Sequence, residues 1–176
     1  MDNNVTRHVP DELRHSDWQA MVLHFLGLDH IGHKTGPKRY EFQALWKYLT
    51  IFSQHMFPKQ VEMDDIVKLV YTAFQQEHHL QDALLVLVGD HGMNDAGNHG
   101  GSSAGETSAA LVFISPKLEA IQTRLTSPAV EDEDFKYYVK VEQNDVVPSL
   151  AALLGFPIPR NSLGVMIPEL LPLWPC

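Results

Sequence analysis

The sequence has little of what marks a disulfide-bonded, membrane-spanning or secreted chain. Its one cysteine is Cys176, so no disulfide can form within the chain. No run approaches the ~20 apolar residues that a helix needs to cross a membrane. Residues 1–17 are polar and lack the apolar core of a signal peptide. By itself, the sequence is therefore expected to be soluble.

Positive charge is also scarce. The chain has 13 Lys and Arg against 22 Asp and Glu, which gives a formal net charge of −9. Nucleic acid requires clustered positive charge, so we expect no nucleic-acid partner. An anionic substrate remains compatible with this balance, because a bound metal ion can outweigh the acidic side chains around it. At 176 residues and 44% hydrophobic content, we expect one domain with a real core over residues 1–176.

Apolar runs alternate with helical patterns along the chain. The helix predictions cover residues 63–79, where Asp64 and Asp65 suit a helix start, and residues 144–155, with a cap at Asn144 or Asp145 and a stop at Gly155. The strand predictions cover residues 18–28, residues 83–89, which read as covered on both faces, and residues 108–115. Residues 157–176 form a tail that is too rich in proline for regular structure. Alternating strands and helices predict an α/β sandwich with a largely parallel sheet.

Two apolar runs end in clusters of acids and imidazoles. GLDHIGHK places Asp29 and His33 after the first, and GDHGMNDAGNHGG places Asp90, His91 and His99 after the second. Ligands of open α/β sheets bind at the carboxyl ends of the strands, so one fold would bring the clusters together. Mixed carboxylate and imidazole ligands suit zinc or manganese better than calcium or magnesium. The conjunction predicts a site for two divalent ions, with zinc preferred and manganese as the alternative.

Each of these residues also has a plainer interpretation. An isolated DxxxH pair is a weak signal, and His30, His78 and His79 are expected to face solvent. The order of the motifs favours the metal site over these alternatives. Two ions about 4 Å apart can stabilise both the attacking and the leaving oxygen of a phosphoryl transfer.

Three segments resemble a known family. GLDHIGHKTGP, GDHGMNDAGNHGGSS and PSLAALLGFPIPRNSLGVMIPELLPLW are similar to the GPI ethanolamine phosphate transferases of the alkaline phosphatase superfamily, in particular to the fungal type that acts on the second mannose. The resemblance implies an endoplasmic reticulum membrane enzyme whose lumenal domain transfers phosphoethanolamine from phosphatidylethanolamine to the GPI precursor. It also implies that this chain is the C-terminal portion of that domain, with membrane spans elsewhere in the parent protein. In such an enzyme Asn4, in the triplet Asn4-Val5-Thr6, fits a glycosylation acceptor.

The resemblance further implies ligand roles. Asp29, His33 and His99 would hold one ion, and Asp90 and His91 would serve the second. The nucleophilic Thr of the family is expected upstream of this chain. The nearby hydroxyls are therefore expected to form turn and loop hydrogen bonds, and these are Thr35, Ser102, Ser103 and Thr107. Residues 38–55 interrupt the family pattern and are interpreted as an insertion.

Three functions follow as hypotheses. The first is a piece of a phosphoethanolamine transferase that has little activity alone, because its nucleophile lies elsewhere. The second is another metal-dependent phosphodiesterase or phosphatase of the same superfamily. The third is a catalytically incompetent metal-binding fragment.

Overall fold

The computed structural model describes residues 2–37, 56–118 and 139–173. The predicted insertion at residues 38–55 lies outside the described residues. The chain divides into two compact units, residues 1–117 and 118–176. Each unit is described by itself.

Helix α4 is the longest element of the first unit. It spans Met56–Gln76, so the helix predicted over residues 63–79 is confirmed in type but begins earlier. Pro58 lies in its first turn, and proline is tolerated there because the first N–H groups of a helix have no acceptor within the helix. The helix therefore begins at Met56, before the predicted acidic pair. The interpretation of Asp64 and Asp65 as the helix start was therefore wrong, because both lie in the helix interior.

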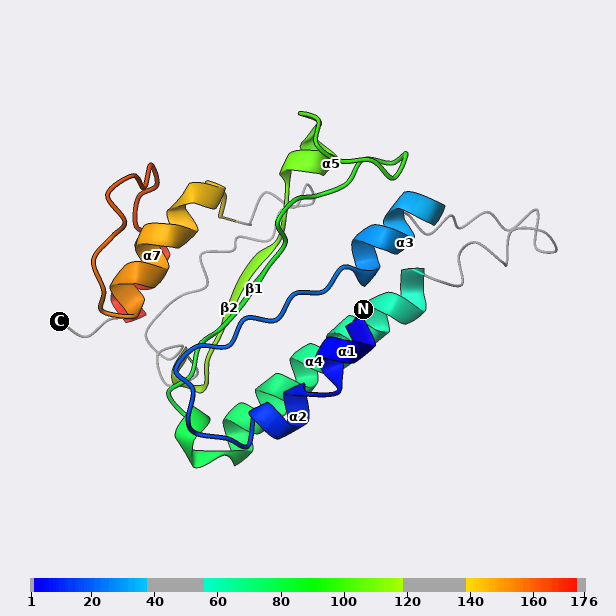
Figure 1. Cartoon of the computed structure of the whole chain (residues 1–176). Helices are drawn as coiled ribbons and strands as arrows, with labels where there is room; N and C mark the ends of the chain where they lie inside the picture. Colours follow the sequence, from blue (N-terminus) through cyan, green and yellow to red (C-terminus); the bar gives the residue numbers. More distant parts are fainter. Residues whose placement is uncertain (1, 38–55, 119–138, 174–176) are drawn as a thin grey trace. The chain divides into compact units, whose positions relative to one another are not determined.

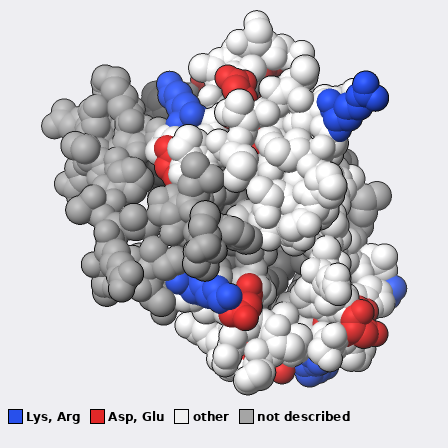
Figure 2. All heavy atoms as spheres, turned by 90° about the vertical axis from the view of Figure 1, so that its left-hand side faces the viewer, with Lys and Arg blue, Asp and Glu red and all other residues white. Residues whose placement is uncertain are grey.

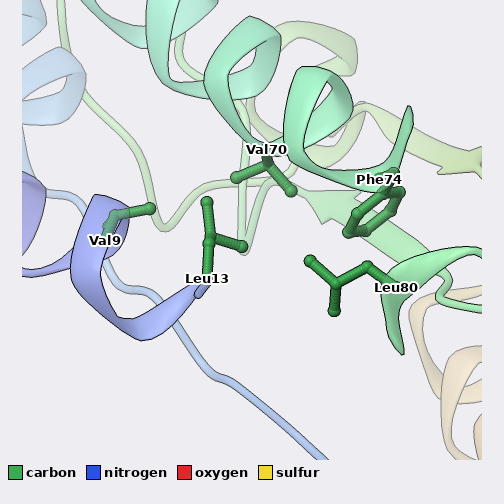
Figure 3. Close-up of a cluster of buried hydrophobic side chains, with 5 residues drawn as sticks. All are labelled: Val9, Leu13, Val70, Phe74 and Leu80. Atoms are coloured by element: carbon green, nitrogen blue, oxygen red, sulfur yellow. The ribbon is translucent and has the colours of Figure 1, made fainter. Parts of the chain in front are cut away.

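Two short helices at the N-terminus accompany α4, α1 (Asp2–Thr6) and α2 (Val9–Glu12) (Figure 1). Val9 of α2 and Leu13, which follows α2, meet α4 in the core of the unit. That core consists of Val9, Leu13, Val70, Phe74 and Leu80, each no more than 7% exposed (Figure 3). Val70 and Phe74 are four residues apart in α4 and so share one face. Leu80 belongs to the short helix η1 (His78–Leu80), which closes the end of the core.

The sheet in the described residues has two strands, β1 (Leu85–Val88) and β2 (Leu111–Ile114). Both fall inside predicted strands. They pair antiparallel, with Leu85 opposite Ile114 and Val88 opposite Leu111. The α/β prediction therefore agrees only in part, because the described sheet is antiparallel, whereas a largely parallel one was predicted. An antiparallel pair needs only a loop between its strands, while a parallel pair needs a crossover connection, usually a helix packed on the sheet.

One strand prediction was wrong, and so was the predicted burial of another strand. The strand predicted over residues 18–28 is not formed, because residues 18–26 are in no strand and residues 27 and 28 begin helix α3, although residues 21–26 alternate between partly buried and exposed as in an extended chain. The interpretation of residues 83–89 as covered on both faces fails because Leu87 and Val88 are 42% and 49% exposed. An apolar run shows that a strand can be buried on both faces. Whether it is buried depends on the segments that pack against it.

The second unit is built around one helix, α7 (Val146–Leu153), which follows the single turn η2 (Gln143–Asp145). The predicted helix over residues 144–155 is thus confirmed, and Gly155 ends it with a φ of 72°. Asp145 accepts hydrogen bonds from the backbone N–H groups of Glu142 and Val165. Asp145 therefore ties the tail to the start of α7. The tail itself ends in another short helix, η3 (Pro168–Leu173), where no regular structure was predicted.

Candidate metal site

Helix α3 (Gly27–Thr35) carries the first cluster. Asp29 and His33 are four residues apart, so they project from the same face of the helix. The Nε2 atom of His33 lies 3.4 Å from Oδ1 of Asp29. His30 is exposed, as expected for a residue outside the site.

A contact between Gly97 and Gly32 brings the loop that carries His99 against α3. Gly97 is buried and has a φ of 79°, a left-handed conformation that suits glycine. A Cβ atom on Gly97 would lie 2.4 Å from the carbonyl oxygen of Gly32 in α3. The loop after β1 therefore touches α3 backbone to backbone at a point where no larger residue fits.

This contact places His99 over the face of α3 that bears the first cluster. Its Nε2 atom lies 3.3 Å from Oδ1 of Asp29, and its ring centroid is 4.9 Å from that of His33. The ligand atoms of Asp29, His33 and His99 all lie within 4.8 Å of one another. The fold thus joins three residues that are up to 70 positions apart in the sequence.

The chemistry of this cluster fits a divalent ion. Oδ1 of Asp29 is buried and accepts no hydrogen bond in the described structure, although two imidazole nitrogens approach it. Two ligand atoms bound tetrahedrally to zinc at about 2.1 Å are about 3.4 Å apart. The separations of 3.3 and 3.4 Å match that spacing. The donor set of one carboxylate and two imidazoles is one that zinc accepts.

Asp90 and His91 lie beside the cluster in different ways. The His91 ring stacks on His99 with a centroid distance of 3.8 Å, so it adjoins the three converging side chains. Its Nδ1 atom lies 2.9 Å from the carbonyl oxygen of Gly92, and donation there would leave Nε2 with its lone pair available. The Asp90 side chain is 76% exposed, and its Oδ2 lies 3.7 Å from Nε2 of His91. Asp90 therefore lies beside His91 and is not one of the three converging groups.

Sequence reasoning missed the residue that organises the loop, Glu106 in the short helix α5 (Ala104–Thr107). Its carboxylate accepts hydrogen bonds from the Ser103 hydroxyl and from the backbone N–H groups of Ser103 and Gly101. It also accepts one from the side-chain amide of Asn94. These bonds, led by that of the Ser103 hydroxyl, lower the pKa of Glu106. The S-x-x-E pattern at residues 103–106 was a readable signal of this capping arrangement.

Three of the four hydroxyls near the motifs form hydrogen bonds with neighbouring residues. Thr35 donates to the carbonyl of Ile31, and Thr107 donates to that of Ser103. Together with the Ser103 bond to Glu106, these contacts match the loop and turn role predicted from the sequence.

The charge of the described surface and the apolar character of its helices bear on which partners the chain could bind. In the view of Figure 2, acidic and basic side chains are scattered over a mainly uncharged face, so its described part offers no surface of one sign. Among residues 2–37, 56–118 and 139–173, no helix combines the length and apolar character needed to cross a membrane.

Comparison with known proteins gives strong sequence similarities. The chain is 58% identical over 174 residues to a protein named GPI ethanolamine phosphate transferase 2 from Aspergillus oryzae, and 58% identical to the protein of that name from Aspergillus fumigatus. It is 46% identical over 184 residues to the Saccharomyces cerevisiae protein of the same name. Each similarity covers 99% of this chain but only 19% to 21% of the relative.

The remaining comparisons concern solved structures and families. No solved structure matches the chain. The sequence model of one family, described as type I phosphodiesterase / nucleotide pyrophosphatase, matches residues 2–145. That match includes α3, the loop after β1 and all five predicted ligands. The chain therefore belongs to the type I phosphodiesterase / nucleotide pyrophosphatase family.

Proposed function

We propose that this chain is part of a metal-dependent enzyme that transfers phosphoethanolamine from phosphatidylethanolamine to a mannose of the GPI anchor precursor. In that reaction the bond between phosphorus and the diacylglycerol oxygen breaks, and a bond forms between phosphorus and a mannose hydroxyl oxygen. The hydroxyl proton leaves with diacylglycerol. The observation that carries the proposal is the convergence of Asp29, His33 and His99 in a chain so similar to the named transferases.

The five predicted ligands would have different roles. Asp29, His33 and His99 would hold one ion, and Asp90 with His91 would serve a second. Two divalent ions, zinc by preference and manganese as the alternative, would supply positive charge at the attacking and leaving oxygens of the phosphoryl group. The His91–Gly92 contact would orient one imidazole, as outer hydrogen bonds commonly do for metal ligands.

The nucleophilic threonine that the family resemblance implies is expected outside this chain. Thr35, Ser103 and Thr107 all donate hydrogen bonds within their own helix or loop, which supports local roles for them. We therefore expect purified residues 1–176 to turn over phosphodiesters little or not at all. Robust turnover by this chain would contradict the placement of the nucleophile.

The proposal includes a lumenal location in the endoplasmic reticulum. Asn4 supports it modestly, because the residue lies in α1 with an exposed side chain, where a glycan would meet no packed neighbour. In a secretory host, the longer protein should lose mass on treatment with an N-glycosidase, and Asn4→Gln should remove that part of the shift. An unchanged mobility would argue against glycosylation at this residue.

A second candidate is a phosphodiesterase acting on soluble substrates. The family match over residues 2–145 favours it as an alternative, because the family is that of type I phosphodiesterases and nucleotide pyrophosphatases. The two candidates share the metal cluster and differ in the acceptor of the phosphoryl group.

The test uses a longer protein that contains these residues. It should transfer labelled phosphoethanolamine from phosphatidylethanolamine to a GPI precursor, and His33→Ala should abolish that transfer. His30→Ala is the matched control, because it removes an exposed imidazole from the same helix and should leave transfer intact. Hydrolysis of a nucleotide diester without transfer to the lipid would instead favour the second candidate.

A further inference from the structure

The start of α3 has no local cap. Leu26 occupies the capping position, and no side chain there forms a capping hydrogen bond. The first N–H groups of a helix have no partner within the helix, so they need one from elsewhere. This requirement matters because Asp29 lies in the first turn of α3.

A residue far away in the sequence meets this need. Oδ1 of Asp2 accepts a hydrogen bond of 3.2 Å from the Leu26 N–H. Asp2 is only 5% exposed, although it is an acid. Its negative charge also complements the positive end of the helix dipole.

Lys59 of α4 holds this carboxylate in place. Its Nζ atom lies 2.7 Å from Oδ2 of Asp2 and 2.7 Å from Oε1 of Glu62. Burial alone would raise the pKa of Asp2, but the Lys59 ammonium and the bond from the Leu26 N–H outweigh it and lower that pKa. The carboxylate therefore remains ionised as a bridge between α3 and α4.

The fit around the bridge is close. A Cβ atom on Gly27 would lie 2.1 Å from Oδ2 of Asp2 and 1.9 Å from Cε of Lys59. The backbone of α3 thus begins directly against the ion pair. Any shift of the pair would move the first turn, which carries Asp29, relative to His99 on the loop.

We propose that Asp2 is a positioning residue for the metal cluster, which acts by capping α3 and tying its first turn to Lys59 of α4. This inference rests on the metal-dependent function proposed above. Asp2 touches no member of the cluster in this role. It sets the distance between Asp29 and the loop imidazole of His99.

The test measures zinc binding by calorimetry on the purified chain. Asp2→Asn should weaken zinc binding about tenfold, the lower end of the effect expected for a residue that supports metal ligands. Asp17→Asn removes an exposed charge, and Val9→Ala removes buried atoms from the core, which contains no member of the metal cluster. Both controls should leave the zinc affinity of the folded chain within about twofold. Asp29→Ala should abolish binding.

A second readout needs no variant. Hydrogen exchange of the wild-type chain should protect the Leu26 amide as strongly as those inside α4, since a buried carboxylate accepts its hydrogen bond. Rapid exchange at this amide would overturn the inference even if Asp2→Asn fails to fold.

The outcomes separate the two proposals. If the wild-type chain binds zinc, Asp29→Ala abolishes binding and Asp2→Asn binds normally, the positioning role is overturned while the metal site stands. If Val9→Ala weakens binding as much as Asp2→Asn does, the effect is general stability and the role is again overturned. If the wild-type chain binds neither zinc nor manganese, both proposals fall.

Discussion

In the core of the first unit, side chains of α2, α4 and η1 fill the space between backbones, among them the buried ring of Phe74. At the candidate metal site, α3 and the loop after β1 touch through Gly32 and Gly97, which have no side chains to separate them. The core is therefore weakened when atoms are removed, and the site is disturbed when atoms are added. The same unit thus has two opposite sensitivities, and both are measurable.

The largest expected effect is on the core. Phe74→Ala should lower the free energy of unfolding by about 3–5 kcal/mol, because it removes a buried ring and leaves a cavity. Urea unfolding measures the change. Phe57→Ala in the same helix is the matched control, because Phe57 is 57% exposed and its loss should cost about 0.5 kcal/mol or less. Equal losses for the two variants would contradict the assignment of the core.

The next effect concerns the glycine contact. Gly97→Ala should lower the free energy of unfolding by about 2–3 kcal/mol, from a strained φ together with a clash against the Gly32 carbonyl. It should also weaken zinc binding about tenfold, because the loop that carries His99 must move.

Gly100→Ala separates these two causes. Gly100 has a φ of 91°, but a Cβ atom there would meet nothing within 4 Å. The variant should therefore lose about 1 kcal/mol from backbone strain alone. If Gly97→Ala is no worse than Gly100→Ala, the backbone contact does not hold the site together.

The sequence predicted much of this arrangement, with clear physical limits. Helix α4 and both strands were readable because apolar spacing reports local geometry directly, as at Val70 and Phe74. The antiparallel pairing was missed because periodicity gives no strand direction. The segment before α3 was mistaken for a strand because an apolar run cannot show whether a ladder partner is present.

The sequence indicated which side chains could form the candidate site, but it did not indicate the backbone contacts that position them. Asp29, His33 and His99 stood out because their side chains carry the ligand atoms. The contact between Gly32 and Gly97 was invisible, since a glycine gives no sign of which backbone approaches it. The bond from the Leu26 N–H to Asp2 was also invisible, because the two residues are 24 positions apart and no local pattern links them.

The smallest predicted effect concerns pH at the loop. The pKa of Glu106 is lowered chiefly by the Ser103 hydroxyl, so its stabilising contribution is present above the ordinary glutamate pKa and is lost as the pH falls through the lowered value. Amide exchange at Gly101 and Ser103 should accelerate over that acidic window, which hydrogen exchange across a pH series would detect. In Glu106→Gln the exchange should already be faster at neutral pH, and this step should be missing. A step that persists in the variant would assign it to another group.

The central claim is that residues from α3 and from the loop after β1 form one metal site. It is tested most directly by a crystal structure of the zinc-loaded chain with anomalous scattering at the zinc edge. We predict a zinc peak about 2.0–2.2 Å from a carboxylate oxygen of Asp29 and from Nε2 of both His33 and His99. A zinc ion bound elsewhere, or these three side chains pointing away from one another around an empty centre, would contradict the account.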